Sequence, residues 1–379
     1  MAFMNKLLKN KTFTRNALTY LLVTVVFIIM YAQQMAGSLT YAMQGQLVPI
    51  CVYISLAVSL NLLVGICGEL SLGHAGFMGV GAFTGIILSA LLKPYVADPT
   101  LRLVLAMLGG GLMAGGFSAV IGIPVLRLHG DYLAIVTLAF GEILRNLLGN
   151  LYVASGDGTF RFAISAEQVE WTETMIINGA KGAVRVEKLA TFPMGFALVM
   201  VTLFVVLNLI NSKEGRAIRA VRDNRIAAES VGINVTAFRM KAFIVSALLA
   251  GMAGALFGLN YSSLKASKFD FNTSIDILVF VVLGGLGNIL GSVISATVLY
   301  ILPEAMKMLA NENMTPALLA AAEFVEKYRM ILYSVILIVL MICTWSPKVK
   351  NALSAFFVPI KEKVSGLFRK KNKEVAGDE

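Results

Sequence analysis

Charged residues are scarce in this sequence. They make up 14% of its 379 residues, whereas hydrophobic residues make up 58%; an ordinary soluble domain carries about 25% charged residues. The chain is therefore predicted to be a polytopic membrane protein. Its formal net charge of +10 does not indicate nucleic-acid binding. The basic residues lie at the two ends and in one central loop, beside apolar segments, where they set membrane topology.

Motifs for catalysis, phosphate binding and metal binding are also absent. The sequence has no G-x-x-x-x-G-K-[ST], so we do not expect it to be an ATPase, and it has no H-E-x-x-H or G-x-S-x-G. Cys51, Cys67 and Cys343 lack metal-ligand spacing, and their odd number argues against a disulfide framework. We expect a chain that is not an enzyme and binds no metal or cofactor.

Long apolar runs are abundant and predict an all-α fold with about eight to ten transmembrane segments, some of them broken by glycine or re-entrant. The first run has two interpretations. We prefer a retained span, but a signal peptide cleaved near residues 35–37 fits the preceding lysines as well. The runs cover residues 17–32, 47–65, 75–92, 101–126, 132–153, 192–210, 242–259, 274–302 and 330–345.

The distribution of lysine and arginine predicts the topology. Loop 212–241 has an excess of basic residues and is expected in the cytoplasm. Loop 154–191 has no such excess, because acidic residues balance its basic ones, and it is expected outside. Residues 1–347 would form the transmembrane domain and 348–379 a basic cytoplasmic tail, with the amino terminus also cytoplasmic. This requires run 274–302 to form either two short legs of a re-entrant hairpin or two cramped crossings.

Glycine clusters interrupt two of the apolar runs, at residues 65–81 and 284–291. Because each glycine costs a helix interior roughly 1 kcal/mol relative to alanine, the backbone there is predicted to break or pack very closely. Broken backbone at membrane depth borders protein or an aqueous cavity, so both clusters are candidates for a pathway. The candidate pathway residues are Gly68, Ser71, Gly73, His74, Gly76, Glu142, Arg145, Asp276, Gly284, Gly285 and Gly287.

Few ionisable residues lie within or beside these runs, and each has two interpretations. Glu69 and His74 either relay protons or contact a substrate ammonium, or they mark a solvated loop end, which we prefer. Glu142 and Arg145 lie three residues apart on one helical face. This spacing favours a structural ion pair over a gate.

The central basic loop has an amphipathic helical pattern. Around Ile218, an apolar side includes Ala217, Val221, Ala228 and Val231, while the opposite side carries arginines 216, 219, 222 and 225. One interpretation is a helix that lies on the membrane surface and sets topology. The other is a helix that docks a cytoplasmic partner.

Five stretches together resemble the second, larger permease subunit of high-affinity branched-chain amino acid ATP-binding cassette importers. They cover most of the chain from Leu60 to Ala296, so the combination is more specific than any single motif. The stretches are LNLLVGICGELSLGHAGFMGVGAF, HGDYLAIVTLAFGEILRNL, EGRAIRAVRDNRIAAESVGINV, KAFIVSALLAGMAGALFG and IDILVFVVLGGLGNILGSVISA.

The resemblance implies a bacterial inner-membrane heterodimer with a second permease, two cytoplasmic ATPase subunits that bind ATP and magnesium, and an external solute-binding protein. Ala227, Ala228 and Gly232 match the A-A-x-x-x-G core of the family's coupling motif, although Ile226 replaces its glutamate. The implied substrates are leucine, isoleucine and valine, delivered by alternating access. A urea, amide or other amino acid permease is the alternative, followed by an ion-coupled secondary transporter. The implied ATPase-coupling residues are Glu214, Arg216, Arg222, Ala227, Ala228 and Gly232.

Overall fold

The computed structural model describes residues 11–128, 130–156, 159–163, 174–309 and 335. The chain divides into two compact units, Met1–Asn311 and Glu312–Glu379, and every helix and strand named below lies in the first. Run 330–345 and the basic tail therefore lie almost entirely outside the described residues, as does His129.

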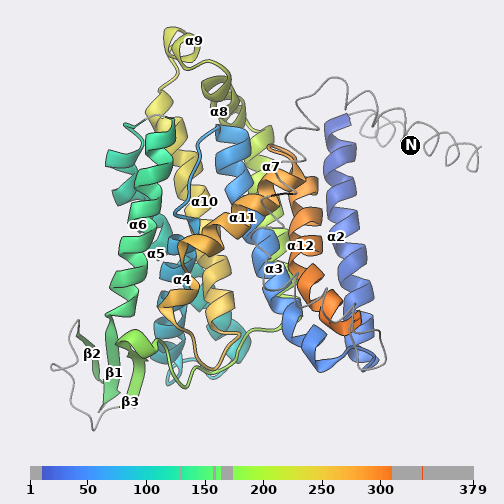
Figure 1. The fold of residues 1–379 in the computed structure, drawn as a ribbon, viewed down its shortest axis with the longest axis vertical. Coiled ribbons are helices and arrows are strands. Elements are labelled where there is room, and N and C mark those ends of the chain that lie inside the picture. Colours follow the sequence, from blue (N-terminus) through green and yellow to red (C-terminus); the bar gives the residue numbers. More distant parts are fainter. Residues whose placement is uncertain (1–10, 129, 157–158, 164–173, 310–334, 336–379) are drawn as a thin grey trace, which may run out of the picture. The chain divides into compact units, whose positions relative to one another are not determined.

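Seven helices within the described residues are long and apolar enough to cross a membrane, as the composition predicts. They lie roughly side by side (Figure 1). Their bounds agree with the predicted runs to within a few residues at most ends; the largest differences are at the starts of α2, α3 and α10. The seven are α2 (Lys11–Met35), α3 (Tyr41–Asn61), α4 (His74–Leu92), α5 (Pro99–Val125), α6 (Asp131–Gly149), α7 (Phe192–Asn211) and α10 (Val235–Gly258).

Glycines bring α4, α5 and α10 into backbone contact at the centre of the bundle. A Cβ atom added at Gly81 of α4 would collide with the backbone of Gly251 in α10, and one added at Gly110 of α5 would lie 2.7 Å from the Gly81 carbonyl oxygen. Gly111 of α5 also packs closely on α10, since an added Cβ would lie 2.6 Å from Cγ of Met252. Small residues thus allow these helices to approach closely.

Both predicted glycine breaks are confirmed. After α3 the chain forms a π-helical turn, η1 (Leu62–Cys67), and leaves it at Gly68, whose φ of +79° is left-handed. The second break separates α11 (Phe271–Gly284) from α12 (Ile289–Leu309). The predicted pair of short legs is only half right. α11 is short, with 14 residues and a length of about 21 Å. α12 is longer, with 21 residues.

The outer loop contains a small antiparallel sheet that the sequence reasoning missed. Its strand order is β2-β1-β3, with β1 at Tyr152–Gly156, β2 at Thr159–Ala163 and β3 at Thr174–Asn178. The predicted helix over 132–153 therefore extends too far. α6 ends at Gly149, because Tyr152 and Val153 pair with β2 and β3 instead.

An ion-pair cluster ties the same outer loop to the spans. The Glu187 carboxylate lies 2.9 Å from Arg102 at the start of α5 and 3.2 Å from Lys93 after α4. Burial acts to raise the pKa of Glu187, but the hydrogen bonds and positive charges of Arg102 and Lys93 together hold that pKa below its ordinary value. The loop is thereby fixed at one end of the bundle.

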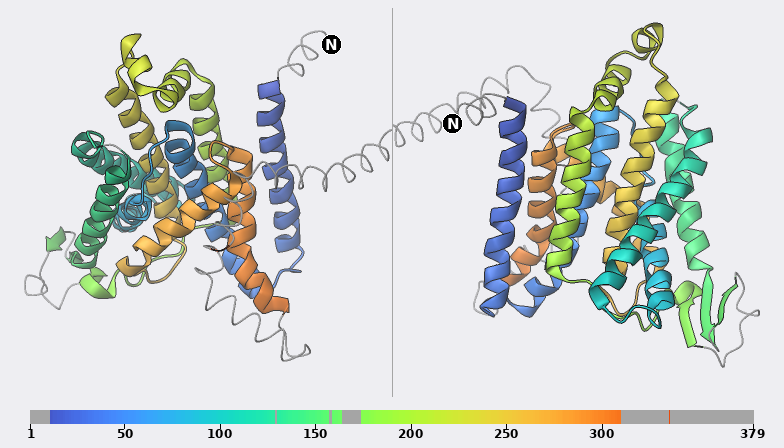
Figure 2. Two further views of the ribbon diagram at one scale, coloured as in Figure 1. Left: turned by 45° about the horizontal axis from the view of Figure 1, so that its top comes forward. Right: turned by 180° about the vertical axis from the view of Figure 1, so that it is seen from behind.

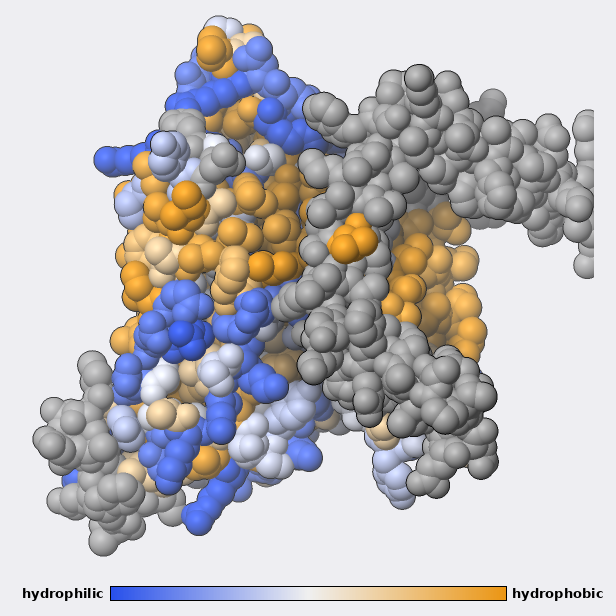
Figure 3. Space-filling view, viewed as in Figure 1, coloured by the Kyte–Doolittle hydropathy of each residue, from blue (hydrophilic) through white to orange (hydrophobic). Residues whose placement is uncertain are grey.

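The sheet and the two short helices after α7 lie at opposite ends of the bundle in both views of Figure 2. Figure 3 shows an apolar zone between two hydrophilic ends, with hydrophilic surface also extending over the lower part of the visible face. This layering is expected for a protein whose middle lies in hydrocarbon.

Candidate functional site

Two short helices, not one, form the amphipathic segment after α7. α8 (Lys213–Asp223) and α9 (Arg225–Ser230) are separated at Asn224, so the prediction of a single helix is wrong. Asn224 has extended backbone angles, and its side chain accepts a hydrogen bond from the Ala227 N–H at 3.0 Å. Asparagine is a favoured N-cap, and this signal was present in the sequence.

Ala228 is the buried point of α9. It is 3% exposed and packs in a small apolar cluster with Val221 of α8 and Val235 of α10, with Ile233 against it. Val231, predicted on the same apolar side, is 74% exposed instead. The break at Asn224 changes the helical phase, which explains why the single-helix wheel fails beyond that residue.

The other candidate coupling residues surround this cluster. Glu214 forms an ion pair of 2.5 Å with Lys241 of α10, while Arg216 and Ala227 are exposed. Gly232 adopts a left-handed φ of +84° and would have open space around an added Cβ. The α8–α9 pair therefore presents a polar, exposed surface above an apolar underside.

Arg222 is the candidate coupling residue that contacts a distant span. Its Nη1 donates to the Gly65 carbonyl oxygen in η1 at 2.7 Å, and its Nη2 lies 3.2 Å from Asp223. A Cβ at Gly68 would lie 2.5 Å from Cγ of Arg222. Gly68 therefore leaves room for the arginine stem, and the guanidinium caps a carbonyl at the helix end.

The two glycine breaks meet through Asn61, a residue that the sequence reasoning missed. The fully buried side-chain amide accepts from the Gly287 N–H at 2.8 Å and donates to Ser292 Oγ at 2.7 Å and to the Asn288 carbonyl at 3.2 Å. A buried, fully bonded amide fixes geometry because any lost bond leaves a polar group without water. An asparagine next to a glycine-rich break was the available signal.

Four candidate pathway glycines are close to this network. Gly285 and Gly287 have left-handed φ angles of +92° and +80°, and a Cβ at Gly284 would collide with the backbone of Gly291. Gly68 lies on the other side of the contact, beneath Arg222. Both breaks and α8 therefore form one continuous set of contacts.

The remaining candidates gather where α4 meets α6 and α11. A Cβ at Gly76 would lie 2.8 Å from Cα of Gly141, and one at Gly73 would collide with the Thr137 carbonyl. The Ala75 N–H donates to Ser274 of α11 at 3.1 Å. Ser71, in the segment before α4, and Asp276, on α11, are both buried. Helix packing accounts for these glycines, and their place on a pathway stays a prediction.

Glu142 and Arg145 form the predicted ion pair within α6, at 2.7 Å, with each side chain about one third exposed. Glu142 also lines a shallow pocket with Gly76, Asp270 and Ser274. The structural interpretation is confirmed to the extent that the two groups bond to each other.

Glu69 and His74 do not mark a solvated loop end, so that preferred interpretation is wrong. Glu69 is 9% exposed and pairs with Arg239 of α10, which is itself 5% exposed. His74 is 2% exposed, and its Nε2 lies 3.0 Å from Ser59 Oγ. Burial is stable here because each group has a partner.

Removing one partner of the Glu69–Arg239 pair is expected to destabilise the protein strongly. Arg239→Met leaves a buried carboxylate and should lower the free energy of unfolding by about 3–5 kcal/mol. Adding Glu69→Gln should recover part of that loss. Glu214→Gln, which breaks the half-exposed pair with Lys241, should cost about 1 kcal/mol or less. Thermal unfolding in detergent checks all three, and equal losses for Arg239→Met and Glu214→Gln would contradict the prediction.

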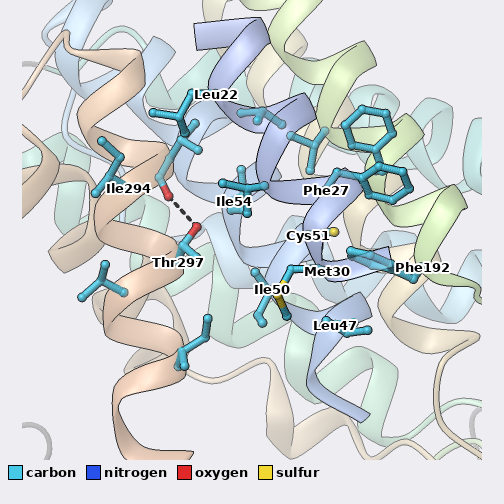
Figure 4. Close-up of a pocket in the computed structure, with 17 residues that line it drawn as sticks. Leu22, Phe27, Met30, Leu47, Ile50, Cys51, Ile54, Phe192, Ile294 and Thr297 are labelled. Carbon is cyan, nitrogen blue, oxygen red and sulfur yellow. Dashed lines mark hydrogen bonds between the residues drawn. The ribbon is translucent and has the colours of Figure 1, made fainter. Parts of the chain in front are cut away.

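An apolar cavity of about 260 Å³ lies between α2, α3, α7 and α12 (Figure 4). Phe27 of α2 closes one side by stacking on Phe196 at a centroid distance of 4.0 Å. Thr297 is the polar side chain among the lining residues, and its hydroxyl donates to the Val293 carbonyl at 2.8 Å. Such a lining offers no partner for the ammonium or carboxylate of an amino acid, so the cavity is separate from the candidate site.

Comparison with known proteins identifies relatives of this chain. The family model described as branched-chain amino acid transport system / permease component matches residues 42–342. The high-affinity branched-chain amino acid transport system permease protein LivM of Escherichia coli (strain K12) is 35% identical over 268 residues, which cover 68% of this chain and 61% of that relative. The chain thus matches about three fifths of the relative's length.

More distant relatives broaden the comparison. The probable branched-chain amino acid transport permease protein LivM of Methanocaldococcus jannaschii is 26% identical, over 62% of this chain and 73% of the relative. The nucleoside ABC transporter permease protein NupC of Lactococcus lactis subsp. cremoris is 25% identical, over 54% of this chain and 62% of the relative. With a family model matched over most of its length, this chain is an integral membrane protein that belongs to the branched-chain amino acid transport system permease family.

Proposed function

We propose that this chain is a permease subunit of an ATP-binding cassette importer that moves branched-chain amino acids into the cytoplasm. The observation that carries the proposal is the α8–α9 pair. Its apolar underside is anchored at Ala228, its opposite side is exposed, and Arg222 contacts the first glycine break. In a chain of this family, such a pair is suited to dock on an ATPase.

Alternating access supplies the mechanism. Closure of the ATPases on ATP would push α8 and α9 as a rigid body, and packed elements with two arrangements convert such a push into a rearrangement of the spans. The segments best suited to rearrange are the glycine breaks at η1 and between α11 and α12, because their backbone already departs from the α-helix. ATP binding and hydrolysis would occur on the partners, and this chain would act without catalysis.

The proposed assembly has a second permease, two ATPases and an external binding protein, with both termini of this chain in the cytoplasm. The outer loop, held to the ends of α4 and α5 through Glu187, then faces the binding protein. Substrate choice would rest largely with that binding protein.

Co-expression with candidate partners tests the proposal. We expect the tagged chain to retain an ATPase through purification in detergent, and the reconstituted complex to take up leucine, isoleucine or valine when ATP and binding protein are supplied. Uptake of urea or a nucleoside in place of these amino acids would assign the importer to a different substrate class. A chain that retains no ATPase and takes up leucine in response to an ion gradient would contradict the importer.

A further inference from the structure

Arg222 joins α8 to a part of the chain 157 residues earlier in sequence. Other contacts hold α8 to the spans that flank it. Arg219 donates to the Ile210 carbonyl of α7 at 2.9 Å, and Glu214 pairs with Lys241 of α10 at 2.5 Å. Those two contacts connect α8 with α7 and α10. The Arg222 contact instead crosses to the end of α3.

The carbonyl that Arg222 binds belongs to the backbone of the break itself. In η1 the Leu63 carbonyl accepts the N–H of Gly68 and, at 3.1 Å, that of Glu69. The Gly65 carbonyl accepts from the guanidinium at 2.7 Å. A charge-assisted bond to a helix-end carbonyl is stronger than a neutral one. Motion of α8 therefore acts directly on the π-helical turn.

From the same turn, contacts continue to the second break. Gly65 packs so closely on Gly287 that a Cβ at Gly65 would collide with its N atom. Four residues earlier, Asn61 holds the α11–α12 turn by its three hydrogen bonds. Both turns are left-handed at glycine, at Gly68 and at Gly285 and Gly287. They are short segments that depart from the α-helix and are bounded by α-helices, so a backbone rearrangement there requires no loss of α-helix.

We propose that Arg222 is the positioning residue that transmits ATPase-driven movement of α8 to the paired glycine breaks, through its hydrogen bond to the Gly65 carbonyl. The inference rests on the proposed function, since it needs an ATPase on α8 and α9. It assigns Arg222 a role distinct from docking. Ala228 anchors the helices that bind the partner, and Arg222 connects those helices to the segments that move.

The test uses the whole complex reconstituted in vesicles. Arg222→Met removes every donor but keeps an aliphatic stem over Gly68, and Lys213→Met is the matched control, because Lys213 is an exposed cation of the same helix. We expect Arg222→Met to retain bound ATPase and ATP turnover within about twofold, while leucine uptake per ATP hydrolysed falls about tenfold. Arg222→Lys should recover part of the uptake, and Lys213→Met should behave as wild type.

Cys67 provides a second readout that a purely structural role would not change. It lies in η1 and is 1% exposed, and Cys51 is a buried reference on α3. Peptide mass spectrometry after N-ethylmaleimide treatment measures the alkylation of both cysteines. We expect ATP to change the alkylation rate of Cys67 relative to Cys51 in wild type and in Lys213→Met, and to leave it unchanged in Arg222→Met.

Several results would overturn the proposal. Normal uptake per ATP and a normal Cys67 response in Arg222→Met would show that the bond transmits nothing. Loss of bound ATPase in that variant would place Arg222 in docking instead. If Arg222→Met is not monodisperse, Arg222→Leu, whose side chain also lacks a hydrogen-bond donor, is measured by the same criteria. A wild-type complex without ATPase contradicts the proposed function itself, which separates that failure from a failure of the relay.

Discussion

Replacing Gly81 with leucine should abolish the folded protein. Gly81 lies where α4 crosses α10, and an added Cβ would collide with the backbone of Gly251 rather than with a movable side chain. Overpacking against a side chain typically costs about 1–3 kcal/mol, and here the helices themselves would have to separate. We expect the free energy of unfolding to fall by about 3 kcal/mol or more, with most of the protein aggregated in detergent.

Gly116→Leu is the matched control for this prediction. Gly116 lies on α5, is exposed, and has no atom within 4 Å of an added Cβ. The same substitution there replaces a helix-breaking residue with an apolar side chain on the outer surface, and should leave stability equal or higher. Size-exclusion profiles and thermal unfolding of the two variants compare them directly. Equal midpoints would show that α4 and α10 are not packed backbone to backbone.

The sequence was sufficient for the helices because membrane spans are set by local composition. Run 192–210 appears as Phe192–Asn211, and run 75–92 as His74–Leu92. Both glycine breaks were also predictable, since glycine disfavours helix wherever it lies. Helix boundaries set by capping side chains were less predictable. Asn224 divides the basic segment, although its residue type is a frequent N-cap.

Contacts between distant segments could not be predicted from spacing. Asn61 binds Gly287 across 226 residues, and Arg239 pairs with Glu69 across 170. Nothing local distinguishes Arg239 from the other cations of the basic loop, and it takes its partner only because α10 packs beside η1. The outer sheet was missed for a related reason, since β1 pairs with β3 across an intervening segment that contains β2.

The candidate site combines features predicted from local sequence with contacts between distant segments. The sequence predicted two breaks and one basic amphipathic segment as separate features, and the packing joins them at Gly65, Gly287 and Arg222. A glycine break by itself shows only that a helix is interrupted. Two breaks that share the amide of Asn61 form one polar network between helices, and the relay proposed for Arg222 would act on this network.

Ala228→Asp should release the ATPase while leaving the transmembrane bundle folded. The new carboxylate would lie in the apolar cluster of Val221, Val235 and Ile233, where an unpaired charge costs several kcal/mol, so α9 is expected to leave its position. Because α8 and α9 lie at one end of the bundle (Figure 1), the spans retain their packing. We expect ATPase bound per permease to fall at least about tenfold.

Ala237→Asp isolates burial from charge. Ala237 is exposed in the first turn of α10, where its N–H donates to the capping Asn234 at 3.1 Å, and a carboxylate near a helix N-terminus is favourable. It adds the same charge close to α9 without entering the apolar cluster, so bound ATPase should stay within about twofold of wild type. Mass spectrometry of the purified complexes measures the ratio of subunits. If Ala228→Asp retains its ATPase, the α9 underside does not set the docking surface. If both variants lose their ATPase, negative charge alone disrupts the interaction, because only Ala228→Asp changes the packing beneath α9.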